Sequence, residues 1–202
     1  MTSTQANALT DDQVNGLVAT SQLQALNTVT IQGLSTATVA GMDSTHIAAL
    51  TSSQVAALSE TQIQALQTSQ VRALETTDVA AMTTAQVAAM TTSQVKALAA
   101  TSVAALGSNQ LNAMTTSQVG ALTAAQVKAL SSSTFASMGT TQVAALTTAQ
   151  VAGLSVAVVG AMSSAQVSSL TTSQVQSLTA NQVKALAANK IAAMTTTQLQ
   201  SI

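Results

Sequence analysis

The chain contains no cysteine, proline, tryptophan or tyrosine, and its one aromatic residue is Phe135. Aromatic side chains normally supply large blocks of buried area, so a core here must be assembled from many small side chains of Val, Leu, Met and Ala. The absence of cysteine excludes disulfides and thiolate metal sites together. It leaves the redox compartment open.

Charge is also scarce, since Asp, Glu, Lys and Arg make up 5% of the 202 residues, against about 25% in typical soluble domains. Intrinsic disorder combines high charge with low hydrophobicity, and this composition is the reverse. The longest apolar stretch, Val156 to Met162, is far shorter than the roughly 20 residues of a membrane-spanning helix. Residues 1–10 lack the basic and apolar regions of a secretory signal. The sequence therefore predicts no transmembrane segment and no signal peptide.

An eight-residue repeat occupies nearly the whole chain. With Leu, Met or Ile as position 1, an anchor occurs every eight residues from Leu26 to Ile202. Upstream, Leu9 and Leu17 keep the spacing, and one nine-residue step leads to Leu26. The array comprises 24 units. We expect residues 1–8 to be an N-terminal lead and residues 9–202 to form a single octapeptide-repeat solenoid.

The other octad positions are nearly as regular. Position 6 is apolar throughout, with Phe135 as its one aromatic occupant, and position 8 is Ala, Gly or Ser. Position 5 is usually Gln, and positions 2 to 4 are mostly Thr, Ser or Ala, so the consensus is L-T-T-S-Q-V-x-A.

A continuous α-helix does not fit this repeat, because its apolar stripe would drift by about 80° per octad and match neither the 7- nor the 11-residue supercoil. A β-strand would point positions 6 and 8 to one face and position 1 to the other. One short helix per octad fits better. With Thr at position 2 as N-cap, Gln at position 5 falls at N3 and completes a capping box.

The expected fold is therefore an all-α solenoid of very short helices, in which positions 1 and 6 face inward. A lone octad buries side chains worth roughly 3–6 kcal/mol, but ordering it costs on the order of 10 kcal/mol, so octads must stack. Val127 and Leu130 are expected to be interior residues. Replacing Gln126 by Ala should cost at most about 1 kcal/mol, the loss of a reciprocal cap.

The number of octads per turn is less directly visible. Met90, Met114, Met138 and Met162 recur at every third octad, which indicates three octads per turn. Gly107 and Gly139 are four octads apart, as are Lys96 and Lys128, which indicates four. We favour three.

No residue pattern indicates catalysis, a cofactor site or a metal site. His46 is the only histidine, and at position 5 it is expected to replace a capping Gln; with Asp43 it offers only two ligands, too few for a good metal site. Asp11 and Asp12 are expected at a helix N-terminus, where negative charge is favourable. Five basic residues without aromatics do not make a nucleic-acid surface. We therefore predict a non-enzyme with no cofactor, no nucleic acid and no small-molecule substrate.

The charges are unevenly distributed. All six acidic residues lie at or before Asp78, whereas four of the five basic residues follow it: Lys96, Lys128, Lys184 and Lys190. Drift in a nearly uncharged array is one explanation, and head-to-tail complementarity between copies is another. The octad register continues to Ile202 without an evident polar cap, and uncapped solenoid ends that dock repeatedly generate filaments.

Octads such as LTTSQVQS (170–177) and MTTAQVAA (82–89) resemble the L-T-T-x-Q-[VI]-x-A-L arrays of very large bacterial surface or secreted proteins, and the resemblance covers almost the whole chain. It implies an extracellular or cell-surface structural segment. Our first hypothesis is a self-assembling filament, sheath or surface-layer subunit whose partners are further copies. The alternatives are a non-polymerising stalk of an adhesin and an ice-binding surface of paired threonines, such as Thr83–Thr84 and Thr147–Thr148.

Overall fold

The computed structural model describes residues 4–5, 8–16 and 20–202. Leu17, the second anchor of the array, lies outside these residues. The chain divides into two compact units, Met1–Ala105 (unit 1) and Leu106–Ile202 (unit 2). The octad register continues through the boundary between them. That the whole array forms one solenoid stays a prediction.

Each unit consists of short α-helices, and the described residues contain no strand. Unit 1 holds α2 (Asp11–Asn15), α3 (Thr20–Gln24), α4 (Thr28–Gly33), α5 (Thr36–Gly41), α6 (Ser44–Ala48), α7 (Ser52–Ala57), α8 (Glu60–Ala65), α9 (Thr68–Ala73), α10 (Thr76–Ala81), α11 (Thr84–Ala89), α12 (Thr92–Ala97) and α13 (Ala100–Ala104).

Unit 2 holds α14 (Ser108–Ala113), α15 (Thr116–Ala121), α16 (Ala124–Ala129), α17 (Ser132–Ala136), α18 (Thr140–Ala144), α19 (Thr148–Ala152), α20 (Val156–Ala161), α21 (Ser164–Ser169), α22 (Thr172–Gln176), α23 (Ala180–Lys184), α24 (Ala188–Ile191) and α25 (Thr196–Leu199). The prediction of an all-α repeat solenoid with one short helix per octad is confirmed.

The capping box forms where it was expected, at octad positions 2 and 5. In α7 the backbone N–H of Gln54 donates to Thr51 Oγ1 at 3.3 Å, and the N–H of Thr51 donates to Gln54 Oε1 at 2.9 Å. The N-cap Thr51 and the C-cap Leu58 both have extended dihedrals. The reciprocal pair satisfies two of the amide groups that a helix start leaves without intrahelical partners. Glycine at the N-cap keeps only half of the box, as Gly107 N–H donates to Gln110 Oε1 at 2.8 Å.

Positions 1 and 6 face the interior of each unit. Val127 is 0% exposed and Leu130 is 4% exposed, and the same two positions are buried in nearly every octad. Phe135 at position 6 is fully buried. Position 8 is half-buried in most octads, as at Ala57 and Ala65. The interior is thus built from repeated small apolar side chains, as the composition indicated.

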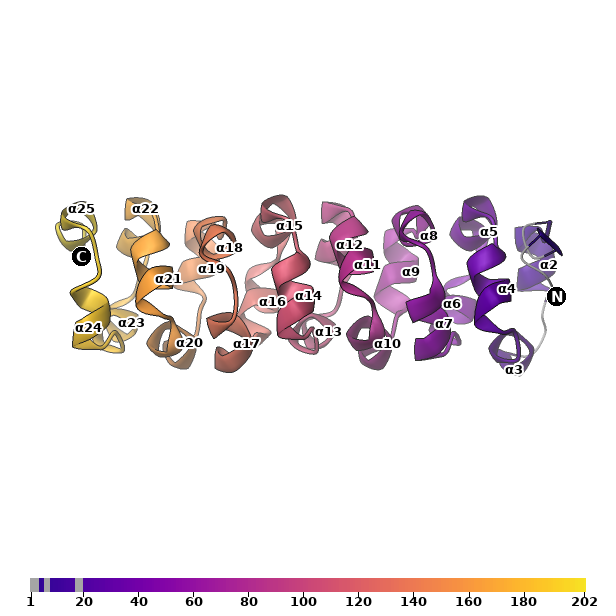
Figure 1. Ribbon diagram of the computed structural model, residues 1–202, viewed down its shortest axis with the longest axis horizontal. Coiled ribbons are helices and arrows are strands. Elements are labelled where there is room, and N and C mark those ends of the chain that lie inside the picture. Colours follow the sequence, from indigo (N-terminus) through magenta and orange to yellow (C-terminus); the bar gives the residue numbers. More distant parts are fainter. Residues whose placement is uncertain (1–3, 6–7, 17–19) are drawn as a thin grey trace. The chain divides into compact units, whose positions relative to one another are not determined.

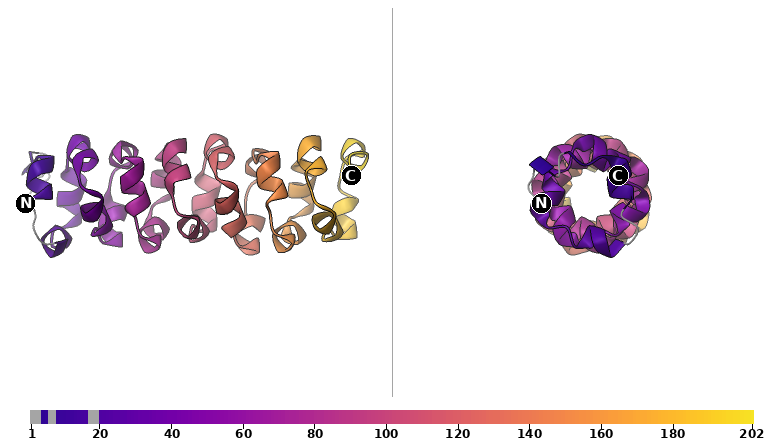
Figure 2. Two further views of the ribbon diagram at one scale, coloured as in Figure 1. Left: turned by 180° about the vertical axis from the view of Figure 1, so that it is seen from behind. Right: turned by 90° about the vertical axis from the view of Figure 1, so that its right-hand side faces the viewer.

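Helices three apart in number pack on each other within each unit, for example α7 on α10 and α17 on α20. The helices of each unit wind around one axis (Figures 1 and 2). This packing agrees with the expectation of three octads per turn. The inter-turn hydrogen bonds described below refine the number, because they also reach the fourth helix back.

Candidate functional site

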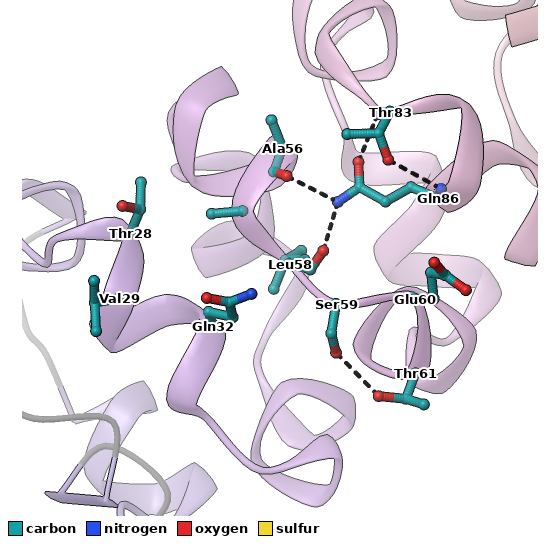
Figure 3. Close-up of a pocket in the computed structure, with 11 residues that line it drawn as sticks. Thr28, Val29, Gln32, Ala56, Leu58, Ser59, Glu60, Thr61, Thr83 and Gln86 are labelled. Carbon is teal, nitrogen blue, oxygen red and sulfur yellow. Dashed lines mark hydrogen bonds between the residues drawn. The ribbon is translucent and has the colours of Figure 1, made fainter.

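The glutamine at position 5 joins neighbouring turns as well as capping its own helix. Gln86 Oε1 accepts from the N–H of Thr83 at 2.7 Å, while Nε2 donates to the carbonyl oxygens of Val55 at 2.9 Å and Leu58 at 2.7 Å. Figure 3 shows the bond to Leu58, together with a longer one to the carbonyl oxygen of Ala56 at 3.3 Å. Gln86 is 2% exposed. A single buried amide therefore connects the start of α11 with the C-terminal end of α7, four helices earlier. We call this contact the inter-turn amide bridge.

The bridge recurs throughout both units. Its donors include Gln54, Gln62, Gln70 and Gln94 in unit 1 and Gln142, Gln150, Gln166, Gln174, Gln182 and Gln198 in unit 2. In each, the amide reaches carbonyls 31 and 28 residues earlier, as from Gln54 to Leu23 and Leu26. The helices that pack on each other are three octads, or 24 residues, apart, and the amide bonds reach 28 and 31 residues. We therefore take the middle of this range, about 28 residues or three and a half octads, as the length of one turn.

An asparagine at position 7 forms a second kind of bridge. Asn112 Nδ2 donates to the carbonyl of Ser137 at 2.8 Å, and its Oδ1 accepts from the N–H of Gly139 at 3.0 Å. Asn15 bonds Gly41 and Asp43 in the same way. These contacts span 25 to 28 residues and support the same turn length.

Most octads that lack Gln at position 5 recur along the chain at intervals close to the length of one turn. In unit 1 the exceptions include His46, Asp78 and Ser102, and in unit 2 they are Thr134, Val158 and Lys190. Successive members are four and then three octads apart in unit 1, and three and then four octads apart in unit 2. Each step is within half an octad of the 28-residue turn, so these residues follow one side of their unit. Thr30 and Thr38 are further exceptions outside this spacing.

We call these residues, His46, Asp78 and Ser102 in unit 1 and Thr134, Val158 and Lys190 in unit 2, the Gln-free row. The hydrogen bonds between turns along this row differ from the amide bridge. Asp78 Oδ1 accepts from Ser52 Oγ at 2.8 Å, and the hydroxyls of Thr76 and Ser102 are 3.5 Å apart. Lys190 Nζ donates to the carbonyl oxygen of Gly160. Val158 is 1% exposed and has no side-chain donor. The spacing of these exceptions was visible in the sequence, but its meaning depends on the length of a turn.

The candidate metal pair does not gain a third ligand. His46 is buried and its Nδ1 lies 4.0 Å from Asp43 Oδ2, but the N–H of Asp43, which a capping Gln would accept, donates to Asn15 Oδ1. Within the described part of the chain, no group of three or more His, Cys, Asp or Glu side chains could hold a metal ion. Asp11 and Asp12 lie in the first turn of α2, whose N-cap is Thr10. This is the helix position that their charge indicated.

Two surface hollows lie within single units. The first, about 520 Å³, is lined in unit 1 by residues of α4 and α8, the end of α7 and the start of α11, including Val29, Gln32 and Glu60 (Figure 3). The second, about 410 Å³, is lined in unit 2 by interior-type residues, among them Val175, Leu178 and Val183, together with Lys184 and Ile202. The first has no convergent set of charged groups. The second is lined mainly by apolar residues of octad positions 1 and 6.

These features define a repeat solenoid of short capped helices. The chain matches the ALTTAQ repeat over residues 18–52, 63–100, 71–108, 92–124, 102–132 and 124–156, which together make up more than half of it, and it belongs to that repeat family. No curated protein and no solved structure matches the chain. In the described residues, no helix is long and apolar enough to cross a membrane.

Proposed function

We propose that this protein is a non-enzymatic structural subunit that assembles head-to-tail with further copies into an extracellular filament, sheath or surface layer. The second hollow supports this proposal most directly. Its lining residues Val175 and Leu178 hold the octad positions whose carbonyls receive the amide bridge elsewhere, as Val151 and Leu154 do from Gln182. A turn of the same repeat has the Gln, Val and Leu side chains that complement such a face.

The charges of the units add a second argument. Unit 1 holds six acidic and two basic residues, a formal net charge of −4 with His46 neutral, whereas unit 2 holds three lysines and no acidic residue, a net charge of +3. The opposite net charges of the two units favour contact between unit 1 of one copy and unit 2 of another, and they steer association. The likeness of the octads to bacterial surface arrays supports the extracellular location.

Electron microscopy of the purified chain over a concentration and salt series tests this proposal. We expect uniform fibres that shorten as salt rises, because salt screens exposed charges. Replacing Leu178 by Asp should abolish the fibres and leave most helicity intact, since Leu178 lines the second hollow. Ala188→Asp is the matched control, because Ala188 is exposed at the first position of α24. Fibres from the Leu178 variant would contradict docking at this face.

A non-polymerising stalk of a large adhesin is the alternative, and short particles of one size under every condition would favour it. An ice-binding surface is a second alternative. It gains support from unit 2, where α19, α22 and α25 stack in sequence and carry the pairs Thr147–Thr148, Thr171–Thr172 and Thr195–Thr196. Against it, the first member of each pair caps its helix, which explains these threonines without ice binding. A thermal-hysteresis measurement without activity would remove this alternative.

A further inference from the structure

Most charged side chains of each unit lie on one side of it; the exposed Glu60 of unit 1 is an exception, because it follows Asp43 by 17 residues, more than half a turn. In unit 1, Arg72 comes 29 residues after Asp43, one residue more than the 28-residue turn. Lys96 follows Arg72 by three octads, and Glu75 follows Asp43 by four octads. All of these intervals are within half an octad of a full turn. We call Asp43, Arg72, Glu75 and Lys96, with Lys128 and Lys184 of unit 2, the charged sides of their units.

The lysines of unit 2 follow the turn length closely. Lys128 and Lys184 are seven octads apart, which is close to two full turns, and Lys190 comes less than one octad later. The opposite side of unit 2 is uncharged and hydroxylated. Ser117 and Ser173 precede Lys128 and Lys184 by close to half a turn, and they are likewise seven octads apart. Both serines are exposed.

The charged sides have few ion-pair partners within the chain. Among the described residues the single contact at ion-pair distance joins His46 and Asp43, at 4.0 Å, and the Asp43 side chain is 68% exposed. Lys128 and Lys184 are exposed. The N-cap carboxylates of Asp43 and Glu75 make no side-chain cap hydrogen bond, unlike the threonine at the start of α7. Their negative charge therefore stays available on the surface.

We propose that the charged sides form the contact between copies, with Asp43 and Glu75 of one copy facing Lys128 and Lys184 of the next. This contact adds to the docking of a further copy at the second hollow. A second copy fits better than a linear polyanion, because unit 1, although Arg72 and Lys96 share its charged side, has a net charge of −4 that would repel a polyanion but complement the lysines of unit 2. This inference rests on the proposed self-assembly and specifies the surface that carries it.

Individual exposed ion pairs contribute little to stability. Complementary charged surfaces act mainly on specificity and on the rate of association. The charged sides are therefore expected to set the order and overlap of the copies and to make assembly sensitive to salt. The apolar contact at the second hollow would supply the remaining affinity.

Two charge-reversed variants test the contact. One carries Asp43→Lys and Glu75→Lys, and the other carries Lys128→Glu and Lys184→Glu. None of these four side chains belongs to the apolar interior or to a position-5 amide bridge, so helicity should match the parent chain. In sedimentation at low salt, each variant alone should need at least tenfold more protein to assemble. An equimolar mixture should regain assembly, because the reversed acids of one variant then meet the reversed lysines of the other.

A neutralising change at Lys128 gives the matched control, because Lys184 also lines the second hollow. Lys128→Gln changes the net charge by the same amount as Ser117→Glu, which lies on the opposite side. The lysine variant should weaken assembly and the serine variant should leave it unchanged. Equal effects of the two variants, or failure of the mixture to recover, would overturn the charged-side contact while leaving assembly in place.

The parent chain separates this inference from the proposed function. If it stays monomeric at every salt and protein concentration, both the proposed assembly and its contact surface fail. If it assembles only after polyglutamate is added, the lysines bind a polyanion, and the contact between copies is overturned.

Discussion

The side-chain amide of Gln86 lies 2.7 Å from the carbonyl oxygen of Leu58, which precedes it by 28 residues. The same side chain accepts the N–H of Thr83. One glutamine per octad thus satisfies the start of its own helix and the end of a helix in the preceding turn. Since a helix of about six residues is unstable alone in water, these contacts are central to the stability of the array.

Replacing Gln86 by Ala should destabilise the chain by about 2–4 kcal/mol, because it removes several hydrogen bonds and leaves buried carbonyls without a donor. The loss of at most about 1 kcal/mol expected for Gln126→Ala took only the helix cap into account. For Gln86 the bonds to Val55 and Leu58 in the preceding turn must be added. Gln64→Ala is the control, since Gln64 is exposed. Urea unfolding followed by circular dichroism measures both. A Gln86 variant as stable as the Gln64 variant would contradict the bridge.

Installing a glutamine in the Gln-free row should stabilise unit 2. In Val158→Gln, the new amide would stand 31 residues after Val127 and 28 after Leu130, the separations that every bridge uses. We expect a gain of about 1 kcal/mol in unfolding free energy and a higher melting temperature. Ala157→Gln at the neighbouring exposed position should have no such effect. A lower melting temperature for the Val158 variant would show that the row does not accept the bridge.

Replacing Val127 and Leu130 together by Asp should unfold the surrounding octads, because both side chains are buried and charges there would be unpaired. Far-ultraviolet circular dichroism should show lost helicity and a lower melting temperature. The control pair, Ala124→Asp with Ala125→Asp, changes exposed residues of α16. Acidic residues in a first helical turn are favourable, so the control should retain its helicity. Parent-like melting of the Val127 and Leu130 variant would disprove their interior placement.

Two glycines at position 7 should respond differently to alanine. A Cβ on Gly160 would lie 3.5 Å from the carbonyl oxygen of Ala185, an ordinary contact, whereas one on Gly120 would lie 3.3 Å from the carbonyl oxygen of Ala145. Alanine in a helix interior is more stable than glycine by roughly 1 kcal/mol. Gly160→Ala should therefore raise the free energy of unfolding by most of that amount. Gly120→Ala should gain less or lose stability. Thermal melts of the two variants compare them directly, and equal gains would contradict the tighter approach at Gly120.

The octad pattern predicted the local structure because each octad contains its own signals. Thr51 and Gln54 are three residues apart, so a capping box can be inferred without knowledge of the fold. The inward placement of Val127 and Leu130 followed in the same way, since residues three apart share a helical face. By contrast, the second role of Gln86 joins residues 28 and 31 apart, and no local rule predicts that separation.

The sequence by itself determined that this protein is an array of short capped helices with an interior of Val, Leu and Met, because capping and helical periodicity act within a single octad. Only the tertiary structure decided the length of a turn, since that length depends on how buried side chains and carbonyls of successive turns meet. Once a turn is known to take about 28 residues, the Gln-free row and the charged sides become spatial features. Lys128 and Lys184, two turns apart, then lie on one side of their unit.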